Sequence, residues 1–185
     1  MKKQITLLAI ILAAFTWGGQ AAMAQDEYDS LTVGSKAPSF YLPTFAGEEF
    51  YLNDYCGKLR QPWKNDRKHF VVLSFFTTEC GTCLKEIPQM QESFEKFAGE
   101  ELKVFPINIR EREEIVAPFL RRNRFKFPVL VDRYGTVSRK YQVGTVPKHV
   151  LIDRDGRIVL ISNGDSTDVQ ERIMAEVTRL LAPQP

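Results

Sequence analysis

The chain has 185 residues, of which 44% are hydrophobic and 26% are charged, and its formal net charge is +2. The excess comes from Lys2 and Lys3, so the rest of the chain has 23 basic and 23 acidic residues. This length suffices for one compact domain with a substantial core. The balance of charge gives no argument for binding to nucleic acid, and we expect no nucleic-acid partner.

The first 24 residues have the pattern of a signal peptide. After the two lysines, residues 5–17 form a mostly apolar run, and residues 22–24 (Ala-Met-Ala) offer small side chains for cleavage after Ala24. The apolar run is shorter than the about 20 residues that a membrane-spanning helix needs. We therefore predict export to the periplasm or another extracytoplasmic space, with no stable membrane insertion after cleavage. The alternative is an N-terminal membrane anchor that stays uncleaved.

A single folded domain is predicted for residues 37–182, preceded by a flexible polar segment at residues 25–36. Apolar alternation in residues 38–42 and 49–52, on either side of Gly47, predicts a β-hairpin. Residues 70–76 are almost continuously apolar and rich in β-forming side chains. That pattern favours a central strand covered on both faces.

The rest of the chain alternates between strand and helix patterns and then adds a second hairpin, for which Asp155-Gly156 is the turn signal. Strands separated by helices pair in parallel through right-handed crossovers, whereas the late hairpin is antiparallel. The predicted fold is therefore α/β, with a mixed central sheet flanked by helices and an N-terminal hairpin extension. The elements are a helix at 84–98, a strand at 102–109, a helix at 113–123, a short apolar stretch at 127–131, a short helix at 137–141, strands at 149–153 and 157–162, and a helix at 169–181.

Two of the three cysteines, Cys80 and Cys83, form a C-x-x-C pair directly after the predicted central strand. A disulfide across two residues closes too small a loop to stabilise a fold appreciably. Structural zinc needs four ligands, and the chain has no second cysteine pair. The start of a helix favours an anion, so a thiolate at Cys80 is stabilised and can attack, and Cys83 can resolve the mixed disulfide. The pair thus predicts redox chemistry, with no cofactor and no bound metal.

The motifs around this pair resemble those of the extracytoplasmic TlpA/ResA-type thiol-disulfide oxidoreductases, within the redoxin (AhpC-TSA) superfamily. The resemblance covers residues 35–181. It rests on the strand that leads into Cys80-Gly81-Thr82-Cys83, Pro88 five residues further on, residues 127–132 (Phe-Pro-Val-Leu-Val-Asp), residues 144–147 (Gly-Thr-Val-Pro), and residues 153–156 (Asp-Arg-Asp-Gly).

This resemblance implies a thioredoxin-like fold and exchange of the Cys80–Cys83 dithiol or disulfide with protein thiols and disulfides. It implies that Val146-Pro147 is a cis peptide facing the cysteines, and that Thr145, Val146 and Pro147 bind the substrate chain. A membrane redox protein is the implied electron donor. Apocytochrome c is the first substrate that the resemblance suggests, in a role like that of cytochrome c maturation proteins.

The sequence departs from the resembled family at two positions. Glu79 replaces the usual aromatic residue before the first cysteine, and a carboxylate there is expected to disfavour the Cys80 thiolate. We therefore expect a reductant rather than a strong oxidant. Ser74 stands where thioredoxins have a buried acidic residue that relays protons, so this relay is expected to be missing or to come from Glu79.

Two other functions remain open at this stage. A copper-binding chaperone would use Cys80, Cys83 and His149, because thiolates and imidazole suit copper. A thiol peroxidase needs a threonine three residues before its reactive cysteine and a proline seven before it; Thr77 meets the first requirement and Leu73 fails the second.

The remaining candidates are assigned structural roles. His149 is expected to be a core or rim histidine, and His69 is expected at the surface. The third cysteine, Cys56, is expected to be a partly buried thiol with no part in the chemistry.

Overall fold

The computed structural model describes residues 31–62, 64–97, 101–164 and 168–182. The elements in this part of the chain follow the order predicted from the sequence. They are β1 (Tyr41–Pro43), β2 (Glu49–Tyr51), the 3-10 turn η1 (Leu52–Asp54), β3 (Phe70–Phe76), α1 (Gly81–Phe97), β4 (Leu102–Ile109), α2 (Glu113–Asn123), β5 (Leu130–Asp132), α3 (Thr136–Lys140), β6 (Lys148–Ile152), β7 (Ile158–Asn163) and α4 (Val169–Leu181).

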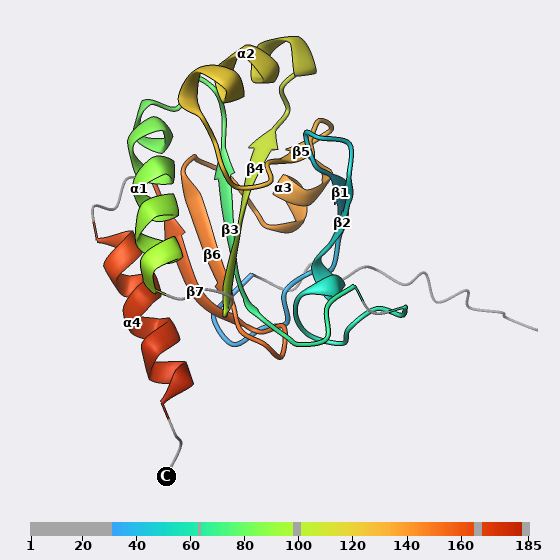
Figure 1. Cartoon of the computed structure of the whole chain (residues 1–185), viewed down its shortest axis with the longest axis vertical. Helices are drawn as coiled ribbons and strands as arrows, with labels where there is room; N and C mark the ends of the chain where they lie inside the picture. The colour runs from blue at the N-terminus through green and yellow to red at the C-terminus, as the bar shows by residue number, and fades with distance from the viewer. Residues whose placement is uncertain (1–30, 63, 98–100, 165–167, 183–185) are drawn as a thin grey trace, which may run out of the picture.

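The main sheet has five strands in the order β5-β4-β3-β6-β7, with β3 at its centre. β3 pairs in parallel with β4, and β4 with β5, whereas β6 and β7 run antiparallel to their neighbours. β1 and β2 form a separate two-stranded antiparallel sheet. The predicted mixed sheet with an N-terminal hairpin is thereby confirmed (Figure 1).

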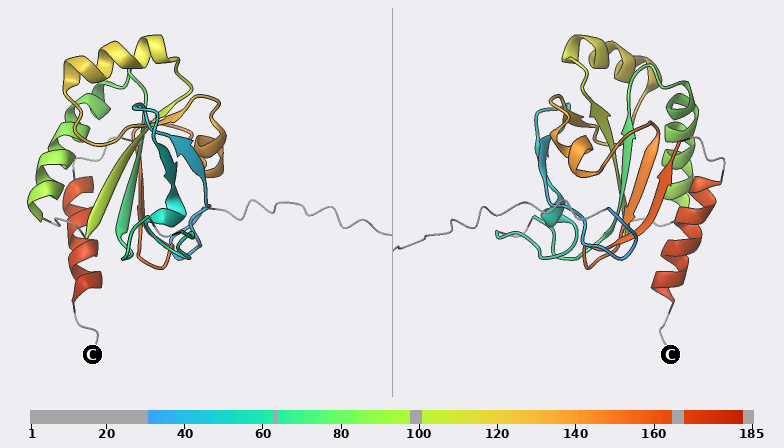
Figure 2. Two further views of the ribbon diagram at one scale, coloured as in Figure 1. Left: turned by 45° about the vertical axis from the view of Figure 1, so that its right-hand side comes forward. Right: turned by 180° about the vertical axis from the view of Figure 1, so that it is seen from behind.

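The two faces of the sheet bury different side chains of β3, because successive residues of a strand point in opposite directions. Val71, Leu73 and Phe75 pack on the face covered by the hairpin and α3. Phe70 and Val72 pack on the opposite face, against residues of α1 and α4. Figure 2 shows these two layers on either side of the sheet. Every residue of β3 is buried, as its continuous apolar run predicts.

The described part of the segment before the hairpin lies along the edge strand β7. The Gly34 amide donates to the Ile158 carbonyl at 2.7 Å, and the Ile158 amide donates to the Ser35 carbonyl at 2.9 Å. An edge strand has unpaired backbone groups, and residues 34–36 pair with them. The polar composition of this segment does not indicate such pairing. The predicted signal peptide, residues 1–24, lies outside the described residues.

His69 differs from its expected surface position, since only 4% of it is exposed. Its amide donates to the Tyr55 carbonyl at 2.7 Å, and the rings of the two residues meet edge to face. Burial lowers the pKa of the imidazole. None of the helices in the described part of the chain combines the length and apolar character needed to cross a bilayer.

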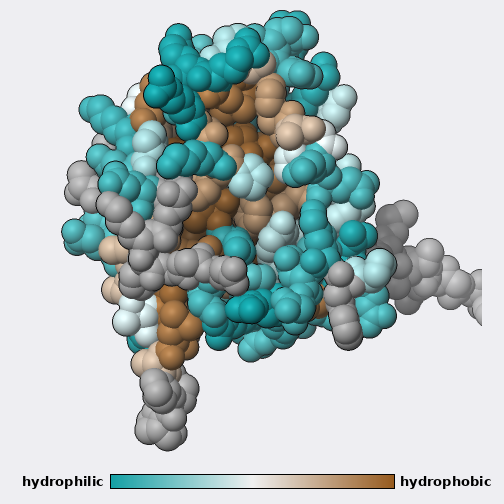
Figure 3. Space-filling view, viewed as in Figure 1, coloured by the Kyte–Doolittle hydropathy of each residue, from teal (hydrophilic) through white to brown (hydrophobic). Residues whose placement is uncertain are grey.

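The surface in the view of Figure 3 is mostly hydrophilic around an apolar strip. Exposed charged side chains lie on the outer faces of α2 and α4, as is typical of helices that bury one face.

Candidate active site

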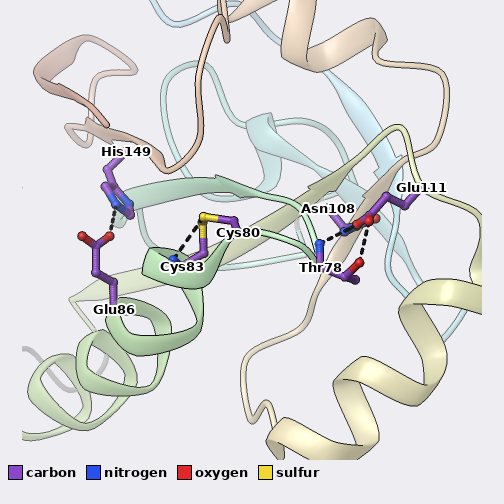
Figure 4. Close-up of a disulfide and its surroundings, with 7 residues drawn as sticks. All are labelled: Thr78, Cys80, Cys83, Glu86, Asn108, Glu111 and His149. Carbon is purple, nitrogen blue, oxygen red and sulfur yellow. Dashed lines mark hydrogen bonds and ion pairs between the residues drawn. A yellow bond between two sulfur atoms is a disulfide. The ribbon is translucent and has the colours of Figure 1, made fainter. Parts of the chain in front are cut away.

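Cys80 and Cys83 form a disulfide at the start of α1, with their Cα atoms 5.3 Å apart (Figure 4). Cys80 immediately precedes the helix, and its Sγ accepts a hydrogen bond from the Cys83 amide at 3.1 Å. This amide belongs to the first turn, whose N–H groups have no partner within the helix and favour a negative charge. The structure thus places a stabilising donor on the sulfur that the sequence predicts to be the nucleophile.

The two sulfurs differ in their access to solvent. Cys80 is half-buried, whereas Cys83 is only 1% exposed and lies among apolar side chains. That cluster joins the end of β3, the first turns of α1 and the inner face of α2, through Phe76, Ile87 and Phe119. A partner molecule can therefore reach the Cys80 sulfur, whereas the Cys83 sulfur is accessible chiefly to Cys80.

The loop between α3 and β6 closes the other side of the cysteine pair. The Val146–Pro147 peptide bond is cis, as the resemblance implies. Val146 packs against the apolar cluster that contains both cysteines, Pro147 is buried, and Thr145 is exposed. Val146 thus lies beside the cysteine pair, with Thr145 and Pro147 next to it in the chain. Their role in binding remains a prediction.

A buried acid–imidazole pair, Glu86 and His149, lies one helical turn beyond Cys83. Glu86 points from α1 toward the sheet, and its Oε2 lies 3.0 Å from Nε2 of His149 on β6 (Figure 4). His149 is fully buried and stands directly opposite Ser74 in the pairing of β3 with β6. Glu86 Oε1, His149 Nδ1 and Ser74 Oγ have no hydrogen-bond partner among the described residues.

Glu86 is a further candidate for the proton relay that was expected to be missing or to come from Glu79. Glu79 is exposed and Ser74 is a hydroxyl, but Glu86 is a buried carboxyl on the same sheet face. Sequence reasoning missed it because Lys85-Glu86 reads as the charged, solvent-facing side of a helix. The spacing of three residues from Cys83, which places both side chains on one face, is the signal that could have found it.

His149 is a core histidine, as expected. Its Nε2 is directed to Glu86, and no group of three or more potential metal ligands occurs among the described residues. This arrangement gives the copper-chaperone alternative no support. Leu73, where a peroxidase requires proline, is fully buried in the core of the main sheet.

Cys56 is free, as expected, but it is fully buried rather than partly buried. Burial raises the pKa of its thiol to about 12. The reactive form of a cysteine is the thiolate, so Cys56 remains protonated and unreactive near neutral pH. Cys80 and Cys83 are therefore the candidate redox pair.

The fold and the cysteine pair together define a thioredoxin-like thiol-disulfide oxidoreductase, a class of enzyme that acts on protein thiols and disulfides. The chain belongs to the AhpC/TSA family, whose model matches residues 33–161. Thiol-disulfide oxidoreductase ResA of Geobacillus kaustophilus is 32% identical over 172 residues, covering 90% of this chain and 92% of that protein. ResA of Bacillus thuringiensis is 27% identical over 183 residues, covering 96% of this chain and 99% of that protein.

Solved structures agree with this assignment. A protein from Chlorobium tepidum, described as the thiol:disulfide interchange protein DsbE, superimposes with a TM-score of 0.70 and 28% identity. The match covers 83% of this chain and all of that one. The predicted fold and enzyme class are confirmed.

Proposed function

We propose that the protein is an exported reductant of disulfides in client proteins, with Cys80 as the attacking thiol and Cys83 as the resolving thiol. The observation that carries this assignment is the difference between the two sulfurs. Cys80 is accessible and accepts the Cys83 amide hydrogen bond, whereas Cys83 is buried behind it. A protein partner can form a mixed disulfide with the first sulfur and is then released by the second.

The reaction begins with the reduced protein. The Cys80 thiolate attacks one sulfur of the client disulfide, forming a mixed disulfide and releasing the other client sulfur as a thiolate, which takes up a proton. The Cys83 thiol loses its proton and attacks the Cys80 sulfur. The client leaves as a dithiol, and two electrons have passed from the protein, which now holds the Cys80–Cys83 disulfide. A membrane redox protein of the dithiol class would restore the reduced state.

Several residues support these steps. The exposed Thr145 and the adjoining Val146-Pro147 would bind the client chain beside Cys80. Glu86 is a buried carboxyl one helical turn beyond Cys83, and it would accept the proton that Cys83 gives up. The resemblance names apocytochrome c as the first client to test.

Glu79 favours the reducing direction. A strong oxidant of this fold stabilises its reduced form through an acidic thiol, and the exposed carboxylate next to Cys80 opposes the thiolate. We expect a reduction potential nearer to the about −270 mV of thioredoxin than to the about −120 mV of DsbA. Equilibration with glutathione or dithiothreitol buffers measures it. Glu79→Gln should raise the potential; a potential near that of DsbA in the unmodified protein would contradict the reductant assignment.

Export rests on the sequence of residues 1–24. The expected mature protein begins at Gln25, and its mass after isolation from cells gives the cleavage position directly. A full-length protein recovered from the membrane fraction would support the uncleaved anchor instead. Recovery of the full-length chain from the cytosol would contradict both the cleaved, exported protein and the uncleaved membrane anchor.

A further inference from the structure

A carboxylate outside the cysteine pair ties the loop before Cys80 to the neighbouring strand. Glu111 follows β4 and accepts three hydrogen bonds (Figure 4). Its Oε2 accepts from the Thr78 amide at 2.8 Å and from Nδ2 of Asn108 at 2.6 Å, and its Oε1 accepts from the Thr78 hydroxyl at 2.6 Å. Hydrogen bonds to an ionised group are roughly twice as strong as those between neutral groups.

The backbone places Glu111 at the end of β4, where β3 gives way to the cysteine loop. Asn108 is fully buried and pairs in register with Phe76, the last residue of β3. Arg110 then adopts a left-handed conformation with φ of 58°, and its amide donates to the Asp132 carbonyl at 3.0 Å. A left-handed non-glycine residue is uncommon, and at this position it turns the chain so that Glu111 faces Thr78.

The tethered loop in turn sets the start of α1. The Cys80 amide donates to the Thr77 carbonyl at 3.2 Å, and the Cys80 carbonyl accepts from the Leu84 amide at 3.2 Å. The position of Thr77 and Thr78 therefore fixes where Cys80 meets the first helical turn. Thr78 is thus linked through Thr77 to Cys80, whose sulfur accepts the hydrogen bond from the Cys83 amide.

We propose that Glu111 is a positioning residue for disulfide exchange, which holds Thr78 so that the Cys80 sulfur stays aligned at the start of α1. This inference deepens the function proposed above and rests on Cys80 being the attacking thiol. Glu111 acts through Thr78. Two variants on the same contact, at Glu111 and at Thr78, test it separately.

The direction in which Glu111→Ala changes the reaction rate of Cys80 distinguishes a positioning role from a purely electrostatic one. Loss of a negative charge near Cys80 would by itself favour the thiolate and speed its reaction. Loss of alignment slows it, and a displacement of about 1 Å costs on the order of 100-fold in rate. We expect Glu111→Ala to react roughly 10–100-fold more slowly than the unmodified reduced protein with a small aromatic disulfide. Stopped-flow absorbance of the released thiolate measures this rate.

Matched variants complete the test. Thr78→Val removes the hydroxyl hydrogen bond to Glu111 without changing the charge, and it should slow the reaction less than Glu111→Ala does. Thr78→Ser keeps this hydrogen bond and should react as fast as the unmodified protein. Glu113→Gln removes an exposed carboxylate two residues away and should leave the rate unchanged. If Glu111→Ala fails to fold, the difference in rate between Thr78→Val and Thr78→Ser tests the proposal instead. Unchanged or faster reaction of Glu111→Ala, or equal rates for the two Thr78 variants, would overturn the proposal. An inert unmodified protein would instead refute the exchange function itself.

Discussion

Cys83→Ser should turn the protein into a trap that holds its clients covalently. Serine cannot attack the Cys80 sulfur, so the first step of exchange proceeds and the second does not. Turnover of protein disulfides is expected to be abolished, and mixed disulfides should accumulate in cells. Non-reducing electrophoresis followed by mass spectrometry identifies the captured proteins, and dithiothreitol should release them.

The control is Cys80→Ser, in which the remaining active-site thiol is the buried one. This variant should capture no client. Cys56→Ala should have no effect on either result, because burial keeps the Cys56 thiol protonated. If Cys80→Ser captured as much client as Cys83→Ser, the attacking and resolving roles of the two sulfurs would have to be exchanged.

His149→Leu should destabilise the protein by about 1–3 kcal/mol, because it leaves the buried Glu86 carboxyl without its hydrogen-bond partner. The cost comes from the unpaired group and exceeds the net value of the pair. Replacing both residues with apolar ones of similar size, Glu86→Met with His149→Leu, should recover most of this loss. Urea unfolding of the oxidised protein, followed by far-ultraviolet circular dichroism, measures the differences.

An exposed ion pair provides the comparison. Arg179 and Glu176 on α4 are joined by two hydrogen bonds at the protein surface, where water screens the charges. Arg179→Ala should leave the unfolding midpoint close to that of the unmodified protein. A His149→Leu variant as stable as Arg179→Ala would show that Glu86 is not held buried and unpaired in the folded variant.

The sequence was sufficient for the parts of the fold that depend on local pattern. The apolar run of β3, the helical period of α1 and the Asp-Gly turn between β6 and β7 each identify an element within a few residues. The cysteine pair could also be predicted from the sequence, because both cysteines lie within one four-residue segment. The cis bond before Pro147 came from resemblance alone.

The parts that sequence reasoning missed depend on contacts between distant segments. Glu86 and His149 are 63 positions apart, and only the register that sets His149 opposite Ser74 brings them together. Glu111 meets Thr78 across 33 positions. His69 lies in a stretch rich in charged residues, and its burial depends on a loop that folds Tyr55 over it. The identity of a charged or polar residue does not by itself reveal which distant residue it contacts.

The attachment of residues 34–36 to β7 determines from which side the molecule can be held. They join β7 at Ile158, beside the end of β6 at Ile152, which pairs with the beginning of β3. The cysteines follow the other end of β3. An affinity tag, a surface linker or a lipid anchor added ahead of residue 31 would thus enter at the opposite pole from the sulfurs. A domain immobilised in that way would present its reactive end outward.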